Sequence, residues 1–353
     1  MGRLTTYYKV RAALHRSLLR RPSHYALLAD RSWTVSPLET KMERAAIFLD
    51  GELDRVRGVQ EETTLEAELA RVREGPRQHA ETRAYLFKDV TLLSGRLFKG
   101  PLNHRMSQLS EEVGAAEEVD MPLAAIASTL MGSIYFGHWM HDDVVMSLAA
   151  QALGPAFEVA RKRYFHEDGY RHLLGLTPRQ VARGRFRELI LLDDWGQNAD
   201  KRRRYHDMRT RFRRSAAGVG NERIYIKRGS AGAARGRDLL NAPELEAHLI
   251  SEGFAVVDPD TMTAQQIATM SMDAKLVVGV EGSHLAHAIF PIAHDGTLVV
   301  MQPPKRFNNV YKDLTDALGL QYAFAVGETA EHGFVVEPAR LSRLFELIAS
   351  GRR

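Results

Sequence analysis

Apolar and polar positions follow a regular pattern over the last third of the chain. Short runs rich in β-branched residues alternate there with segments whose apolar residues recur at helical spacing. This pattern predicts five buried strands, at Ile224 to Lys227, Phe254 to Val257, Leu276 to Val280, Leu298 to Met301 and Tyr322 to Val326. Strands that alternate with helices pair in parallel, so residues 221–337 are predicted to form one doubly wound, Rossmann-like domain.

The segments between these strands carry local signals for helix ends. Asn241 stands three residues before Glu244, and Thr263 stands three before Gln266, which is capping-box spacing. Gly319 stands where a helix would end in the left-handed conformation. These signals place helix starts and stops between the strands, so they strengthen the α/β prediction.

Residues 30–200 show a weaker pattern, which permits a second α/β domain of more irregular build. The predicted elements are two strands and two helices, at Ala45 to Leu49, Ala84 to Leu93, Thr64 to Arg73 and Met131 to Leu153, the last one long. Residues 201–220 are expected to link the two domains, and residues 338–353 to form a C-terminal helix.

Length and composition fit an ordinary globular protein of two domains. The 353 residues are 44% hydrophobic and 26% charged, which excludes collagen-like, fibrous and wholly disordered chains. The absence of cysteine excludes disulfides and thiolate metal sites. We find no apolar run long enough to span a membrane and no apolar core of a secretory signal, so a cytoplasmic location is expected.

Charge is distributed unevenly along the chain. Residues 1–220 hold 35 Lys or Arg against 28 Asp or Glu, whereas residues 221–337 hold 9 against 15. Eight of the fourteen residues from Lys201 to Arg214 are basic, which favours an exposed interdomain helix over a nucleic-acid-binding segment. Residues 1–29 contain no acid and have apolar residues near helical spacing, as in a helix on an anionic membrane; a solvated basic helix is the alternative.

Basic and glycine residues follow the first strand of the C-terminal domain, in IYIKRGSAGAARGR. The strand delivers Lys227 and Arg228 to its carboxyl end, and a loop with Gly229, Gly232 and Gly236 follows. Ligands bind at that end of an open α/β sheet, and glycines let backbone amides approach an anion. The motif predicts a phosphate site, although its spacing matches neither the dinucleotide fingerprint nor the Walker loop.

A second motif, LVVGVEGSHLAHAIF, leads from a strand into a predicted helix start at Glu281, Gly282 and Ser283. The free amides of residues 282–284, including that of His284, are expected to face the same anion site. Glu281 can accept hydrogen bonds from sugar or ribose hydroxyls. His284 and His287 are three apart and lack a third ligand, so they make a weak metal site.

The long predicted helix of the N-terminal half contains YFGHWMHDDV. His138 and Asp142 are four residues apart on one helix face, as an imidazole base and its orienting carboxylate would be. His141 and Asp143 are expected on other faces, with Asp143 as the substitute base. A surface contact between His138 and Asp142 is the alternative.

The pair Asp258 and Asp260 superficially resembles an Asp-x-Asp motif that holds a divalent metal. It follows a predicted parallel strand directly and precedes a capped helix, where acids are common. No metal site is therefore predicted.

Taken in order, these motifs resemble glycosyltransferase family 61 over roughly residues 130–326. The similarity lies in IYIKR, RDLLNAPELEAHLISEGF, MTAQQIATMSMDA, VVGVEGSHLAHAIF and the upstream FGHWMHD. It implies a GT-B fold of two Rossmann-like domains facing across a cleft, an inverting and metal-independent mechanism, and a nucleotide-sugar donor as substrate, without a cofactor. The family residues matched are Arg228, Asn241, Gln266, Gly279 and Gly282; the chain departs by having Glu281 where the family usually has histidine.

The resulting hypothesis is a sugar transferase acting in capsule, exopolysaccharide or other surface glycan synthesis. The donor site comprises Lys227, Arg228, Arg237, Asn241, Gln266, Glu281, Gly282, Ser283 and His284. His138 is the expected base, with Asp142 and Asp143 as carboxylate candidates. The expected acceptor is a glycan or a lipid-linked glycan, with peripheral membrane contact and no nucleic-acid partner. A nucleotide-sugar epimerase or hydrolase of the same fold, or a basic nucleic-acid-binding protein, are the alternatives.

Overall fold

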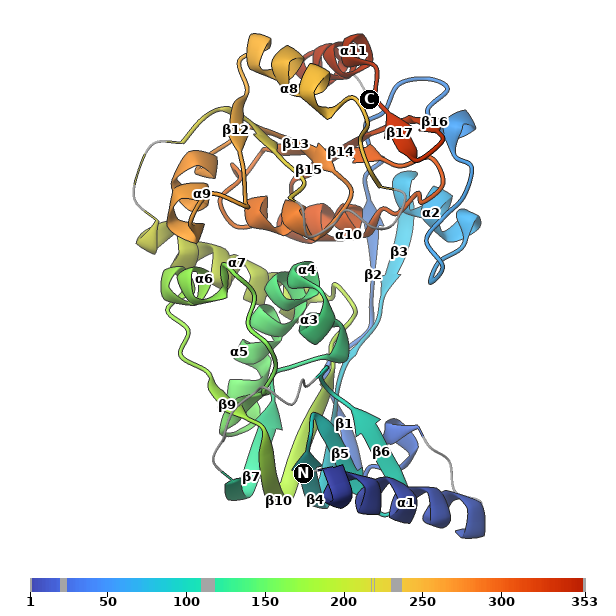
Figure 1. Cartoon of the computed structure of the whole chain (residues 1–353), viewed down its shortest axis with the longest axis vertical. Helices are drawn as coiled ribbons and strands as arrows, with labels where there is room; N and C mark the ends of the chain where they lie inside the picture. The colour runs from blue at the N-terminus through green and yellow to red at the C-terminus, as the bar shows by residue number, and fades with distance from the viewer. Residues whose placement is uncertain are drawn as a thin grey trace. The chain divides into compact units, whose positions relative to one another are not determined.

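A computed structural model describes residues 2–19, 24–108, 118–216, 218, 220–229 and 237–351. The chain is a mixed α/β protein that divides into two compact units (Figure 1). Unit 1 comprises Met1–Glu39, His79–Phe165 and Leu176–Arg204. Unit 2 comprises Thr40–Gln78, His166–Gly175 and Tyr205–Arg353, so two segments that the sequence pattern groups with residues 30–200 cluster with the C-terminal part.

Unit 2 is built on a five-stranded parallel sheet, and all five predicted strands are confirmed. The sheet order is β12-β11-β13-β14-β15, with β11 at Arg223–Ile226, β12 at Ala255–Val257, β13 at Leu276–Val280, β14 at Thr297–Gln302 and β15 at Gln321–Val326. Every pairing is parallel. The central strand β13 is buried throughout, which is why it reads as an unbroken apolar run.

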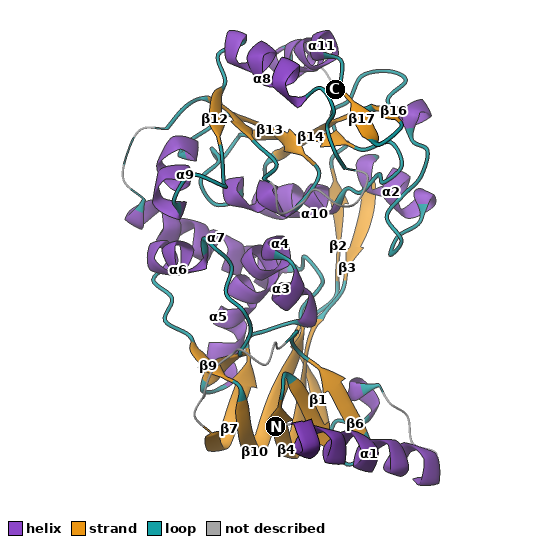
Figure 2. Ribbon diagram, viewed as in Figure 1, coloured by secondary structure: helices purple, strands orange, loops and turns teal. Residues whose placement is uncertain are grey.

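Helices cover both faces of this sheet (Figures 1 and 2). One core includes apolar side chains of α8 (Ala242–Ser251), α11 (Pro338–Ala349) and the strands they cover. The helices α9 (Ala264–Ser271) and α10 (Val310–Leu318) lie on the opposite face. The predicted capping box of Thr263 with Gln266 and the left-handed Gly319 are both confirmed.

Smaller elements complete unit 2. They are α2 (Leu65–Val72), α6 (Glu167–Leu174), the 3-10 turn Leu53–Arg55, and two strand pairs, β2 (Glu39–Glu43) with β3 (Gly75–His79) and β16 (Glu328–Ala330) with β17 (Gly333–Val335). The first pair begins and ends at the boundary with unit 1. The strand expected at Ala45 to Leu49 is wrong. Within this extended segment only Ile47 forms a β-bridge, to Ala323.

Unit 1 contains an eight-stranded mixed sheet, not the parallel Rossmann-like sheet expected there. Its order is β6-β5-β4-β10-β7-β8-β9, and β1 pairs with β4. The strands are β1 Arg31–Ser36, β4 Thr82–Leu93, β5 Arg96–Lys99, β6 Leu102–Arg105, β7 Glu118–Ile126, β8 Ala156–Val159, β9 Arg179–Val181 and β10 Arg183–Asp193. Ser94 and Gly95 both have positive φ, and this tight turn makes β4 and β5 antiparallel.

The long helix expected from Met131 to Leu153 is broken in the structure. It consists of α3 (Leu130–Ile134), α4 (Phe136–His138), a π-helical turn (Trp139–Asp143) and α5 (Val144–Leu153). Tyr135 has extended dihedral angles and interrupts the helix after α3. Unit 1 also contains the 3-10 turn Tyr25–Leu27 and α1 (Gly2–Leu19).

The basic run from Lys201 forms most of α7 (Ala199–Ser215), which begins in unit 1 and continues in unit 2. The sequence predicted an exposed helix, but Lys201, Arg204 and Arg209 are each at most 1% exposed. Their burial follows from polar partners within each unit: Lys201 and Arg204 bond to unit 1, and Arg209 donates to the carbonyl of Ile292 in unit 2. Among the described helices, none combines the length and apolarity needed to cross a bilayer.

Candidate active site

The first group of candidate residues lies at the carboxyl edge of the parallel sheet in unit 2. Arg228 comes two residues after β11, and Glu281 directly follows β13, the neighbour of β11. Because β12 lies on the other side of β11, the chain connections diverge at this point of the sheet. In open α/β sheets, ligands bind beyond the carboxyl ends of the strands at such a switch point.

Three arginines surround Glu281 there; we call Arg228, Arg237, Arg306 and Glu281 the arginine cluster. Nη1 of Arg237 donates to Oε2 of Glu281 at 3.1 Å, and Nε of Arg306 lies 3.6 Å from the same oxygen. Nη1 of Arg228 donates to the backbone carbonyl of Glu281 at 2.7 Å. One largely buried carboxylate thus faces two guanidinium groups, and a third bonds the backbone of the same residue, which leaves an excess of positive charge.

Burial makes this excess of charge unfavourable. Burial and repulsion from Arg237 lower the pKa of Arg228 to about 10. Burial and the charges of Arg228 and Arg237 lower the pKa of the adjacent His284 to about 3, so its imidazole is neutral. An anion bound here would relieve both effects, and strongly perturbed groups in a site of this kind are typical of function.

Several polar atoms of this site lack partners. Nε2 of His284 and the Nε atoms of Arg237 and Arg306 are buried, and within the described part of the chain they have no hydrogen-bond partner. Buried polar atoms are nearly always bonded in folded proteins, so these atoms are available for a ligand. Guanidinium donors suit an anion with several oxygens, such as a phosphate group.

Gly282 permits the close packing of this site. Its φ is +151°, and a Cβ atom would lie 3.0 Å from Nη1 of Arg228 and 3.2 Å from Nδ1 of His284. The helix start expected at Ser283 is a 3-10 helix, Ser283–Ala288. Six residues align too few peptide dipoles to attract an anion strongly, so the positive charge here comes from the arginines.

Lys227 does not join the arginine cluster. Its ammonium group lies 3.2 Å from Glu246 and 3.6 Å from Asp258, in an ion pair that raises its pKa. Neighbouring residues of an extended segment point in opposite directions, which explains why Arg228 reaches Glu281 and Lys227 does not. The expected loop glycines Gly232 and Gly236 lie outside the described residues.

Asn241 and Gln266 are engaged in local structure. Nδ2 of Asn241 donates to the carbonyl of Val336 at 2.9 Å, and Oδ1 accepts from the amide of that residue. Gln266 closes the capping box by accepting from the amide of Thr263 at 2.8 Å. Their proposed contacts with a donor remain predictions, which these bonds do not support.

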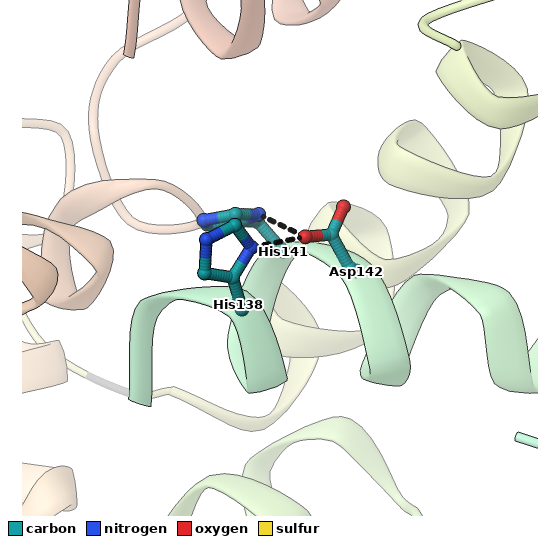
Figure 3. A group of neighbouring side chains, drawn as sticks. All are labelled: His138, His141 and Asp142. Carbon is teal, nitrogen blue, oxygen red and sulfur yellow. Dashed lines mark hydrogen bonds and ion pairs between the residues drawn. The ribbon is translucent and has the colours of Figure 1, made fainter. Parts of the chain in front are cut away.

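The second group of candidates lies in unit 1, at the end of α4, on the π-helical turn and on α7. Figure 3 shows its members His138, His141 and Asp142. Oδ2 of Asp142 accepts the Nδ1 protons of His138, at 2.8 Å, and of His141, at 3.1 Å. Oδ1 accepts from the ammonium group of Lys201 at 2.9 Å. We call these four residues the His-Asp cluster.

The expected pairing of His138 with Asp142 is therefore present, but the expectation for His141 is wrong. Positions 138, 141 and 142 have the spacing i, i+3 and i+4, which places all three on one side of a helix. The wider π-helical turn keeps them together. Such turns are rare and occur frequently at functional sites.

The charges of this cluster fix its protons. Burial alone would raise the pKa of Asp142, but Lys201 and the two imidazoles outweigh burial and hold this pKa well below its usual range. Burial lowers the pKa of His141, which is therefore neutral. An ionised carboxylate that accepts from Nδ1 leaves the lone pair of each imidazole on Nε2. His138 is 27% exposed and His141 only 6%, so His138 is the accessible base.

Asp143 points away from this cluster. Its Oδ1 accepts from the amide of Thr129 at 2.9 Å and from the hydroxyl at 2.8 Å, and Thr129 in turn caps α3. Burial raises the pKa of Asp143 well above its usual range. Through these contacts Asp143 fixes Thr129 at the start of α3. Its role as a substitute base stays a prediction.

His138, His141 and Asp142 also have the spacing of potential metal ligands, with ligand atoms within 4.8 Å of one another. Two features favour a proton-transfer role instead. Both imidazoles turn a protonated Nδ1 toward the carboxylate, and the Lys201 ammonium group already neutralises that carboxylate. A cation bound at Asp142 would have to displace these bonds and lie near a buried ammonium group.

Sequence reasoning missed three residues of the two clusters. His141 could have been found from its i+3 spacing to His138. Lys201 lies in the basic run that was predicted to be an exposed helix. Arg306 lies after β14, in a segment that contains no recognisable motif. Both reach their clusters through pairings between residues distant in sequence.

A family comparison matches the central part of the chain. Residues 136–300, just under half of it, match the family model described as Glycosyltransferase 61. No curated protein gives a significant match. The matched region includes the π-helical turn and the strands that lead to Arg228 and Glu281. Over residues 136–300 this chain is similar to glycosyltransferase family 61, which indicates a glycosyltransferase.

Proposed function

We propose that this glycosyltransferase transfers a sugar from a nucleotide-diphosphate sugar to a glycan hydroxyl, by an inverting mechanism that needs no metal and no cofactor. The observation that carries the proposal is the excess of buried guanidinium groups around Glu281 at the switch point of the parallel sheet. A diphosphate supplies the anionic oxygens that such a group binds. Glu281, with Asn308 3.3 Å from its Oε1, is the residue that accepts from a sugar or ribose hydroxyl.

In the proposed reaction, an acceptor hydroxyl attacks the anomeric carbon from the side opposite the leaving diphosphate. The hydroxyl proton passes to Nε2 of His138, whose imidazole is oriented by Asp142. The bond from the anomeric carbon to the phosphate oxygen breaks, and the departing electrons stay on the diphosphate. Arg228, Arg237 and Arg306 neutralise that charge, as a metal ion does in other phosphate-transferring sites.

Unit 2 then binds the donor, and unit 1 binds the acceptor. A role in capsule, exopolysaccharide or other surface glycan synthesis belongs to the same proposal, with a cytoplasmic, peripheral location. Support for membrane contact comes from α1, where Leu4, Tyr7, Val10 and Leu14 are each about half exposed while Ala12 is buried. An apolar stripe on a helix without acids suits an anionic lipid surface.

The test is ligand binding followed by product analysis. Nucleoside diphosphates and their sugars are screened by thermal shift, since a ligand at 100 times its Kd stabilises the fold by about 2.7 kcal/mol. The product formed from the binding sugar nucleotide is then examined by NMR. A glycoside of inverted anomeric configuration is expected; an epimerised sugar nucleotide, free sugar alone or a retained configuration would contradict the proposal.

A further inference from the structure

Trp195 is a half-exposed aromatic residue on an unusually well-anchored loop of unit 1. The loop follows β10, and the indole side chain is 49% exposed. Its neighbour Asp194 is 6% exposed and pairs with Arg204 through two bonds of 2.7 and 2.8 Å. The carbonyl of Asp194 accepts from Lys201 of the His-Asp cluster at 2.7 Å.

The other side of the loop is fixed as well. Gly196 lies so close to the backbone of Ala80 that a Cβ atom would be 2.1 Å from its carbonyl oxygen. Asn198, which is fully buried, donates to that same carbonyl at 3.0 Å. Burying polar groups on both sides of an exposed tryptophan fixes the ring in place while leaving its apolar surface in water. Such a surface is a marker of a binding site when it lies beside other functional groups.

The indole does lie beside the base. Its ring centroid is 6.3 Å from that of His138, with the two planes at 80°. Trp195 also lines a cavity of about 180 Å³, together with Asp142, Thr129, Met131 and Leu192. Drug-sized ligands fill roughly 300–1,000 Å³, so this cavity suits a single ring.

We propose that Trp195 is the platform on which the acceptor sugar ring stacks, so that the acceptor is a sugar hydroxyl and not a serine or threonine of a protein. This inference rests on the proposed function and names the acceptor class of the same site. A pyranose ring has an apolar face of C–H groups that packs on an aromatic ring, while its hydroxyls lie at the ring edge. The short distance between the two rings places a sugar stacked on the indole close to His138.

The first experiment measures binding without turnover. Methyl pyranosides of glucose, galactose and mannose are titrated while intrinsic tryptophan fluorescence is recorded, since the chain has three tryptophans and Trp139 is fully buried. At least one glycoside is expected to change the emission of the wild-type protein and of Trp33→Phe, but not of Trp195→Phe. Lack of response to every glycoside, or a response that survives Trp195→Phe, would overturn the inference.

The second experiment measures steady-state kinetics with the sugar nucleotide found by the screen. Trp195→Ala should raise KM for the glycoside acceptor about tenfold, with kcat, donor KM and hydrolysis of the donor by water within twofold. Trp195→Phe should restore most of the acceptor affinity, and Trp33→Ala serves as the matched tryptophan control. The inference would be refuted if transfer to a serine- or threonine-containing peptide were faster than to any glycoside. It would also be refuted if Trp195→Ala changed the acceptor KM and the donor KM equally.

Failure of the two proposals can be distinguished. Absence of nucleotide-sugar binding refutes the proposed function, whereas normal donor binding and hydrolysis with no effect at Trp195 refutes only the acceptor platform.

Discussion

The two clusters each centre on one buried carboxylate, but their surrounding charges differ. Asp142 is balanced by one ammonium group and accepts from two imidazoles, so its charge orients both rings. Glu281 is outnumbered by three guanidinium groups, so positive charge remains. The comparison teaches that the ratio of cations to carboxylates sets the chemistry a site is suited to: a balanced cluster suits proton transfer, and one with excess cations suits an anion.

The largest effect on turnover is expected in the His-Asp cluster. His138→Ala should reduce kcat by about 100- to 10,000-fold, because it removes the general base, while the affinity for the nucleoside diphosphate stays unchanged. Single-turnover kinetics and calorimetry measure the two quantities. His248→Ala, which removes an imidazole bonded to Ser342 in unit 2, is the control.

Two outcomes would break this assignment. The first is that His138→Ala keeps most of its activity while a folded Asp143→Asn protein loses it. In that case the base would be a carboxylate. Loss of donor binding in His138→Ala would place this helix in donor binding.

The balance of charge at Asp142 can be tested through stability. Lys201→Met leaves the buried carboxylate without its cation and should lower the free energy of unfolding by about 3–5 kcal/mol. Urea unfolding measures this loss, and Lys275→Met, at the exposed pair with Glu222, should leave the stability nearly unchanged, because water screens that pair. Asp142→Asn combined with Lys201→Met should lose less than the sum of the single variants; full additivity would show that the two residues do not interact.

Substitutions in the arginine cluster should weaken the binding of nucleoside diphosphates. Arg228→Ala should weaken nucleoside-diphosphate binding by roughly 1.5–3 kcal/mol, the scale of a charged hydrogen bond, as measured by calorimetry. Lys227→Ala is the matched control, because that side chain is paired with Glu246 and Asp258 and should change the affinity by less than about twofold. Equal losses in both variants would show that the sequence motif as a whole binds the donor; no loss in Arg228→Ala would remove it from the site.

The smallest effect is expected from chelation. Because Lys201 neutralises Asp142 and both imidazoles donate from Nδ1, turnover should change by less than about twofold in EDTA. Assays before and after chelation, with metal analysis of the purified protein, measure this. Activity lost in EDTA and regained with Mn²⁺ or Mg²⁺ would assign His138, His141 and Asp142 to a metal.

The sequence determined the parallel sheet of unit 2 and two of its helix ends, at Thr263 and Gly319, whereas the capping box expected at Asn241 is wrong because that side chain bonds Val336. Strands buried on both faces read as continuous apolar runs, and a capping box such as Thr263 with Gln266 is a contact between residues three apart. The same local rule found His138 with Asp142, one helical turn apart. Arg228 and Glu281 were found because carboxyl ends of parallel strands meet at one edge.

Tertiary structure alone decided the rest. The ammonium group of Lys201 is buried because Asp142, 59 residues away, compensates its charge, and a run of arginines and lysines gives no sign of which member will be paired. Arg306 joins Glu281, and β4 pairs antiparallel with the distant strand β10 as well as with its hairpin neighbour β5. Local patterns record interactions within a turn or a strand, whereas the charge balance of a site depends on residues that only the completed fold brings together.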